Sequence, residues 1–202
     1  MRIPVRAQPP QILQIYREPL KPGSETAYRA IEEDTARLVA ALGCPHPYLG
    51  AQSLTNLEVW WFNGYESSAE KQQVADAYAT NMRLMTALQQ NGQRKAPLRL
   101  EPVEAIAAWR HDLTVGAPWI LGHGRFLVIT VTKSADRIAG TVFEAPDGTR
   151  FIVNTAHTRE QADAARAQSG ANSNILAVRP RFSFPADEWI AADPEFWRPN
   201  SP

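Results

Sequence analysis

The chain has 202 residues, of which 44% are hydrophobic, and its 21 basic and 21 acidic residues give a formal net charge of zero. This length suits one large domain or two small ones, and the intermixed charges argue against a nucleic-acid partner or a membrane-surface partner. No apolar run is long enough to cross a bilayer. A single cysteine, Cys44, excludes an intrachain disulfide and argues against a structural zinc site.

The first ten residues carry Arg2 and Arg6 but lack the apolar core of a signal peptide. We expect this segment to be a disordered lead-in, as the ends of many domains are. The expected location of the protein is therefore the cytoplasm. An exported form whose leader has been trimmed is the alternative.

Residues 11–17 are rich in strand-forming side chains and precede a proline-glycine break, so they are predicted to form the first strand. Residues 24–42 predict an amphipathic helix, because apolar side chains recur there at three- and four-residue spacing. Ser24 can cap its start, and Gly43 can end it. The residues predicted on its polar face are Arg29, Glu32, Glu33 and Arg37. Two further strands are predicted at residues 48–54 and 57–63.

A second long helix is predicted from the capping-box pattern of Ser67 and Glu70 and is expected to end at Gly92. A polar return and a last strand over residues 103–111 follow. The order strand, helix, strand, strand, helix, strand is the ferredoxin-like βαββαβ plan, which we assign to residues 11–113. Because this plan hosts many unrelated functions, it does not by itself name a reaction.

The rest of the chain repeats part of this plan. Its predicted elements are a strand at residues 125–132, a hairpin at 138–144 and 150–155, a capped helix at 158–170 and a strand at 174–182. A short link, residues 133–137, replaces the first helix. We therefore expect a second, degenerate ferredoxin-like half over residues 124–202, ending in a tail that packs through its aromatic side chains. One continuous α+β domain is the alternative.

The first half of the chain resembles a known group of proteins. Residues 20–23 (LKPG), residues 58–63 (EVWWFN) and the length of the βαββαβ unit are similar to the dimeric α/β-barrel superfamily, which includes antibiotic-biosynthesis-monooxygenase-like and NIPSNAP-like proteins. The resemblance covers about half of the chain. It implies two sheets that face each other, within one chain or across a homodimer, and that enclose a pocket for a small molecule.

Strand alternation divides the predicted sheet into two faces. The face expected to pack on the helices carries Leu13, Ile15, Val59, Trp61, Ile106 and Ala108. The face expected to line the pocket carries Gln14, Tyr16, Gln52, Glu58, Trp60, Phe62, Trp109 and, at the strand end, His111. Apolar walls with a few polar groups suit a small apolar or aromatic ligand. The alternative is that the same side chains fill an interface between sheets.

Glu58 and His111 are the candidate catalytic residues of this set. A carboxylate among aromatic rings is suited to proton abstraction, and a histidine can act as base or ligand. The alternative for Glu58 is an ordinary salt bridge with Arg17 or Arg110. For His111, a hydrogen-bonded structural role is the alternative.

Other site motifs are missing from the sequence. It contains no metal-ligand spacing, nucleophile motif or phosphate-binding glycine motif, so we expect no metal and no organic cofactor. Haem-degrading members of the superfamily carry their haem-binding histidine on a helix, and the two long predicted helices contain none. Arg179 and Arg181 could bind an anion or simply form a solvated face. We expect a binder of a small apolar or aromatic ligand. A cofactor-independent monooxygenase-like enzyme and a structural or stress-associated module without an open pocket are the alternatives.

Overall fold

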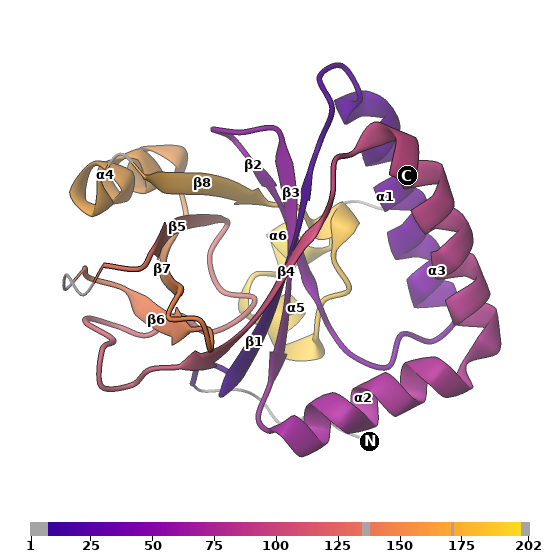
Figure 1. Cartoon of the computed structure of the whole chain (residues 1–202), viewed down its shortest axis with the longest axis horizontal. Helices are drawn as coiled ribbons and strands as arrows, with labels where there is room; N and C mark the ends of the chain where they lie inside the picture. Colours follow the sequence, from indigo (N-terminus) through magenta and orange to yellow (C-terminus); the bar gives the residue numbers. More distant parts are fainter. Residues whose placement is uncertain (1–7, 135–137, 171, 199–202) are drawn as a thin grey trace.

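The computed structural model describes residues 8–134, 138–170 and 172–198 of the chain (Figure 1). Most of the predicted lead-in, residues 135–137 of the predicted link and the last four residues of the predicted tail lie outside the described residues. The strands are β1 (Ile12–Pro19), β2 (Leu49–Ser53), β3 (Glu58–Tyr65), β4 (Val103–Trp109), β5 (Phe126–Thr132), β6 (Thr141–Glu144), β7 (Arg150–Ala156) and β8 (Ser173–Val178). The helices are α1 (Glu25–Ala41), α2 (Ser68–Thr80), α3 (Met82–Lys95), α4 (Arg159–Ser169), α5 (Asp187–Ala192) and α6 (Pro194–Trp197), with short 3-10 turns η1 (Ala96–Leu98) and η2 (Pro180–Phe182).

The described strands form one closed antiparallel barrel in the order β1-β3-β2-β8-β5-β7-β6-β4. Helices α1 and α3 pack together on one side of the barrel, and α4 lies beside β8 on the opposite side (Figure 1). The protein therefore has an α+β fold built around an eight-stranded barrel. One chain supplies all the strands of this barrel, so closing it requires no second copy.

The start of α1 is fastened to η1 by an unexpected use of Ser24. This residue occupies the N-cap position, but its hydroxyl donates to the carbonyl oxygens of Lys21 (2.6 Å) and Leu98 (2.8 Å) and does not cap the helix. At the other end, Gly43 has φ +80°, the left-handed conformation with which helices commonly end. The predicted bounds of α1 are thus confirmed, while the predicted serine cap is wrong.

The second long helix predicted from the sequence is in fact two helices that meet at Asn81. The Asn81 side chain accepts a hydrogen bond from the backbone N–H of Leu84 (3.1 Å) and donates to the carbonyl oxygen of Leu42 (2.8 Å). Asparagine competes with the helix backbone for hydrogen bonds, which explains the break at this position. The predicted end at Gly92 is also wrong, because α3 continues to Lys95.

We expect Asn81→Ala to lower the free energy of unfolding by about 1–2 kcal/mol, the usual cost of losing a helix cap. The variant loses both the cap of α3 and the contact with α1. Urea denaturation measures this loss, with Gln90→Ala on the exposed face of α3 as the control. The control should stay within about 0.5 kcal/mol of the wild type. If Asn81→Ala had an equally small effect, Asn81 would not stabilise the junction of the two helices.

The barrel interior is filled by side chains, as expected for a barrel of this size. Trp60 stacks on Phe62 with ring centroids 6.0 Å apart, and Trp119 meets Phe62 edge-on at 5.9 Å. The other large interior side chains include Leu13, Ile15, Leu49, Leu127, Ile129, Phe143 and Leu176. The interior is therefore a packed core rather than an open pocket.

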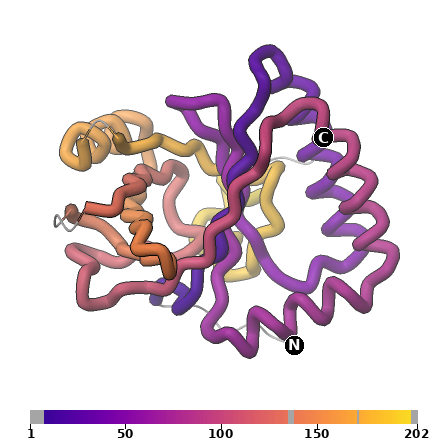
Figure 2. Tube along the Cα trace, in the orientation of Figure 1, coloured from indigo at the N-terminus to yellow at the C-terminus, as the bar shows by residue number. Residues whose placement is uncertain are grey.

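The two ends of the barrel differ. One end is closed by the loop that carries Trp119 and by α5 and α6, whose Trp189 and Trp197 are buried in the same core. In Figure 2 this yellow C-terminal segment lies beside the indigo and magenta strands of the first half, far from it in sequence. The predicted strand at 174–182 ends early at Val178, because Pro180 lacks a backbone N–H and begins η2. The other end of the barrel contains the candidate site.

Candidate functional site

The structure corrects the predicted faces of β1. On β3 the alternation is as predicted, with Trp60 and Phe62 in the barrel core and Trp61 against the helices. On β1 it is the reverse, because Leu13 and Ile15 lie in the core. Residues 12–16 are almost all able to sit on either face, so their sequence does not distinguish the two registers, and a one-residue shift exchanges the faces.

Gln14 and Tyr16 therefore leave the predicted pocket. Tyr16 packs on Trp61 with ring centroids 6.1 Å apart, on the helix side of the sheet. Gln14 donates to Glu104 and accepts a hydrogen bond from Tyr65 (3.0 Å) on the outer surface of the barrel. These two residues do not share a face with Trp60, as had been predicted.

On β4 the alternation is as predicted, because Ala107 and Trp109 lie on the core side and Ile106 and Ala108 face outward. The predicted packing of these two outward residues on the helices is wrong, since Ile106 is 42% exposed and Ala108 is exposed as well. Gln52, predicted to line the pocket, accepts hydrogen bonds from Arg179 (3.1 Å) and Arg29 (3.5 Å) on the outer surface. These contacts place Gln52 in a different site.

The two predicted catalytic residues lie at opposite ends of β1. Glu58 pairs with Pro19 at the end of this strand. His111 follows Trp109, whose backbone N–H donates to the carbonyl oxygen of Gln11 before the start of the strand. A strand of this length spans about 25 Å, so Glu58 and His111 cannot act in one site. Trp109 shares the end of β1 at which His111 lies, with the two rings 5.5 Å apart.

Glu58 forms the salt bridge with Arg17 that was the alternative prediction. Arg17 Nη2 lies 2.9 Å and 3.2 Å from the two carboxylate oxygens of Glu58, and the indole N–H of Trp60 donates to the same carboxylate at 2.9 Å. The Arg17 guanidinium also stacks over the Trp60 ring at 4.3 Å. These contacts form a cluster at the open end of the barrel, in which Glu58 accepts hydrogen bonds and is not a free base.

A groove of about 590 Å³ lies beside this cluster, at the seam between β4 and β6. The two strands pair at Ala108–Glu144 and at Trp109–Phe143, and the earlier residues of β4 extend past the end of β6. The lining residues are Arg17, Val103, Glu104, Ala105, Ile106, Val131, Ala145, Pro146, Asp147, Thr149 and Phe151. Strand stagger, which every closed barrel requires, therefore leaves a hollow next to the core.

The groove has an apolar floor and charged groups at its margins. Lys133 lies 2.8 Å from the Asp147 carboxylate, and together with the backbone N–H of Thr149 it lowers the pKa of Asp147 to about 2. Arg17 is the cation that lines the groove, and its Nε is buried without a hydrogen-bond partner in the described part of the chain. A bound molecule with an acceptor oxygen could accept the hydrogen bond that Arg17 Nε leaves unused.

The sequence could not reveal this groove. The turn at Pro146, Asp147 and Gly148 was predicted correctly as part of a hairpin. That turn lies next to β4 only because β6 pairs with β4 when the barrel closes, and no local sequence pattern encodes this pairing.

A second group of ionisable side chains is buried between the sheet and the helices. We call it the buried ion cluster, consisting of Glu18, Tyr28, Glu32, Lys95 and Arg99. Lys95 Nζ lies 2.6 Å from Glu32 and 3.5 Å from Glu18, Arg99 lies 3.4 Å from Glu18, and the Tyr28 hydroxyl donates to Glu18. Glu32, predicted on the polar face of α1, is 2% exposed. Burial raises its pKa, and the two carboxylates raise the pKa of Lys95 although burial opposes them.

The single cysteine makes hydrogen bonds, and the described residues group no side chains into a metal site. Burial raises the pKa of the Cys44 thiol, which lies 3.2 Å from the Tyr78 hydroxyl. Among the residues that the structure describes, no three His, Cys, Asp or Glu side chains are grouped to hold a metal ion. Likewise, none of the described helices is long and apolar enough to cross a membrane.

Comparisons with known proteins support the fold alone. No protein-family model matches the sequence, and no curated protein matches it. A structure from Fusobacterium nucleatum subsp. nucleatum, provisionally described as a monooxygenase, aligns over 86% of this chain and 93% of its own, with a TM-score of 0.51 and 10% identity. A second provisional monooxygenase, from Lactobacillus acidophilus, aligns over 85% and 94% with a TM-score of 0.45 and 7% identity. A provisional chlorite dismutase aligns over 90% and 98% with a TM-score of 0.44 and 10% identity.

Proposed function

We propose that the protein binds a small apolar or aromatic molecule in the groove between β4 and β6, with Arg17 contacting an oxygen of the ligand. The observation that carries this proposal is the combination of an apolar floor and one buried guanidinium donor in a single hollow. The volume of about 590 Å³ lies in the range of small-molecule sites. The ligand site is thus displaced from the barrel interior, where Trp60 and Phe62 are part of the packed core, to its open end.

The floor of the groove is the outer margin of the barrel core. Ala105, Val131 and Ala145 are partly buried against the core, and Phe151 belongs to it. These side chains offer the ligand a preformed apolar surface, and the stacking of Arg17 on Trp60 fixes the guanidinium before a ligand arrives. Preorganisation of this kind lowers the entropic cost of binding.

Filling the groove should abolish binding. We expect Ala145→Trp to weaken any ligand found in a panel of phenols, quinones and fatty acids at least tenfold, because the indole occupies the floor of the groove. Fluorescence titration and thermal shift report the binding, and Met82→Ala, at a highly exposed position on α3, is the control.

Arg17→Gln provides the second test, since it removes the donor but leaves the groove open. It should weaken ligands that carry a carboxylate or phenol oxygen more than purely apolar ones. Equal affinities in wild type and Ala145→Trp, or a panel without any ligand, would overturn the proposal.

A cofactor-independent monooxygenase is the second candidate function. It is favoured by the fold similarity to the Fusobacterium protein and by the placement of Glu58 and Trp60 behind Arg17. Oxygen uptake in the presence of each bound ligand tests it. Consumption that is lost in Glu58→Gln would support catalysis, while binding without consumption would support a binding protein.

We also propose that the barrel consists of two ferredoxin-like halves, residues 11–113 and 124–202, as in the dimeric α/β-barrel superfamily. The strand order supports this, because one half contributes β4-β1-β3-β2 and the other contributes β8-β5-β7-β6. When the strands of each half are counted along the chain, both sequences read fourth, first, third, second. A homodimer of such a chain would join outer surfaces, since its two sheets already face each other.

A further inference from the structure

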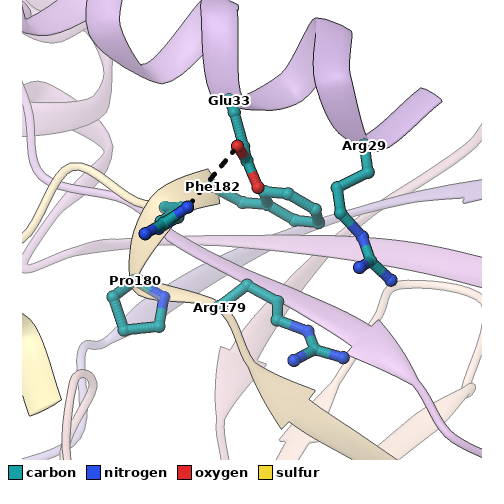
Figure 3. A pocket seen from close by; sticks show the side chains of 6 residues that line it. Arg29, Glu33, Arg179, Pro180 and Phe182 are labelled. Atoms are coloured by element: carbon teal, nitrogen blue, oxygen red, sulfur yellow. Dashed lines mark ion pairs between the residues drawn. The ribbon is translucent and has the colours of Figure 1, made fainter. Parts of the chain in front are cut away.

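A cluster of arginines lines a separate pocket on the outer surface of the barrel (Figure 3). The pocket has a volume of about 210 Å³ and lies where α1 crosses the segment after β8. Its lining residues are Arg29, Glu33, Arg179, Pro180, Arg181 and Phe182. It contains none of the residues of the groove between β4 and β6.

The positive charges of this pocket are only partly compensated. Glu33 lies 3.9 Å from Arg181, an ion pair drawn as a dashed line in Figure 3. In the part of the chain that the structure describes, neither Arg29 nor Arg179 has a carboxylate oxygen within 4.0 Å. Both instead donate to the neutral amide oxygen of Gln52, at 3.5 Å and 3.1 Å. Two guanidinium groups therefore share one weak acceptor.

The environment of Arg179 shows that this arrangement is costly without a ligand. Burial lowers the pKa of Arg179, and the nearby positive charge of Arg29 lowers it further. Arg179 Nε is also buried without a hydrogen-bond partner among the described residues. A buried donor in this state costs free energy unless something accepts its hydrogen bond. An anion in the pocket would supply the acceptor and the missing charge together.

The backbone holds Arg179 in place. Its N–H donates to the carbonyl oxygen of Gly50 at 2.8 Å, and its own carbonyl oxygen accepts from Ser183 Oγ at 2.8 Å and from the N–H of Phe182 at 2.9 Å. Gly50 permits this approach, because a Cβ there would lie 2.7 Å from Phe182 Cβ. The guanidinium thus extends from a fixed turn, and in Figure 3 it lies on the same side of the pocket as that of Arg29.

We propose that this pocket binds a small phosphate monoester with a hydroxyl-bearing body. Two arginine forks match the geometry of a phosphate group better than that of a single carboxylate. Glu33 would repel a bare anion, but it can accept hydrogen bonds from hydroxyl groups on the carbon skeleton of the ester. Pro180 and Phe182 provide an apolar wall against which a small carbon skeleton can lie.

Isothermal titration with glucose 6-phosphate, inorganic phosphate and glucose tests the proposal. Glucose 6-phosphate should bind most tightly, inorganic phosphate more weakly and glucose not measurably. Arg179→Gln should weaken the binding of glucose 6-phosphate at least tenfold. Arg83→Gln removes one positive charge outside the pocket, on α3, and should leave the affinity unchanged. The affinity should rise between pH 5.5 and 7.5, because a phosphate monoester gains its second charge near pH 6.

Glu33→Gln separates the two parts of the ligand. Removing this carboxylate should tighten inorganic phosphate and reduce the preference for glucose 6-phosphate over it. Arg29 is exposed, so Arg29→Gln serves as the binding-deficient variant if Arg179→Gln does not fold.

The proposal would be overturned by no binding of either phosphate compound, by an equal loss in Arg83→Gln, or by an affinity that does not depend on Arg29 and Arg179. Binding of nucleic acid but not of glucose 6-phosphate would also overturn it. Because the groove is separate, Ala145→Trp should retain the binding of glucose 6-phosphate.

Discussion

Trp60→Ala is expected to lower the free energy of unfolding by about 3–5 kcal/mol, the usual cost of truncating a buried tryptophan. The Trp60 side chain is 1% exposed, and its ring stacks on Phe62 and lies under the Arg17 guanidinium. Truncating Trp60 leaves a cavity in the barrel, and it also removes the indole N–H that donates a hydrogen bond to Glu58. Urea denaturation followed by circular dichroism measures the effect.

Two further variants locate the origin of this loss. Trp60→Phe keeps most of the buried volume, so its loss should be clearly smaller than that of the alanine variant. Met82→Ala, at a side chain that is 70% exposed, should stay within about 0.5 kcal/mol of the wild type. If Trp60→Ala were as stable as Met82→Ala, the barrel interior would not be the packed core described above.

Lys95→Met is expected to destabilise the protein by about 3–5 kcal/mol at pH 8, because removing one partner of a buried ion pair leaves an uncompensated charge. Lys95 lies between the buried carboxylates of Glu18 and Glu32. Arg99 contacts Glu18 at 3.4 Å and would compensate that carboxylate in part. Glu32 would lose its ion-pair partner, so it is the group that should carry most of the penalty.

The penalty should depend on pH in a defined direction. The folded-state pKa of Glu32 is already raised above its ordinary value of about 4.3, so the folded state holds this proton more tightly than the unfolded state. The stability that this group contributes is complete below pH 4.3 and is lost as the pH rises through the raised value. Without Lys95 that value rises further, so the variant should be most destabilised at pH 8 and less so at pH 5.

Two controls accompany this measurement. Lys133→Met removes an exposed lysine paired with Asp147 and should cost far less than Lys95→Met, because solvent screens the pair. Because the pKa of Asp147 is about 2, this cost should not change between pH 5 and pH 8. The double variant Glu32→Gln with Lys95→Met should recover a large part of the loss. If the double variant loses as much free energy of unfolding as the two single variants added together, Glu32 and Lys95 are not coupled.

The elements of the fold were predictable because their signals are local. Helix α4 illustrates this, since the pattern Thr158 and Gln161 forms a complete capping box and Gly170 ends the helix. Asn81 shows where local reasoning fails: the apolar spacing of the second helix continues past it, and its bond to Leu42 holds in place the side chain that caps α3. Such a contact between helices is absent from the local pattern.

The sites were less predictable than the elements because they depend on contacts across the fold. Trp60 and Glu58 were found together because they alternate on one strand. Arg29 and Arg179 meet at Gln52 from distant parts of the chain. The burial of Glu32 could not be read from α1 itself, since it results from the way in which α3 brings Lys95 against it.

The position of β8 in the barrel has a consequence for synthesis of the protein on the ribosome. Among the described strands this one is made last, yet it joins β2 of the first half to β5 of the second. Until it has been translated, the sheet face that carries Leu13, Ile15 and Phe62 has no partner sheet to complete its enclosure. At ordinary rates of translation, the time from the end of the first half at residue 113 to the end of β8 is on the order of 3–13 s. The nascent chain therefore presents an apolar surface for several seconds before the barrel can close.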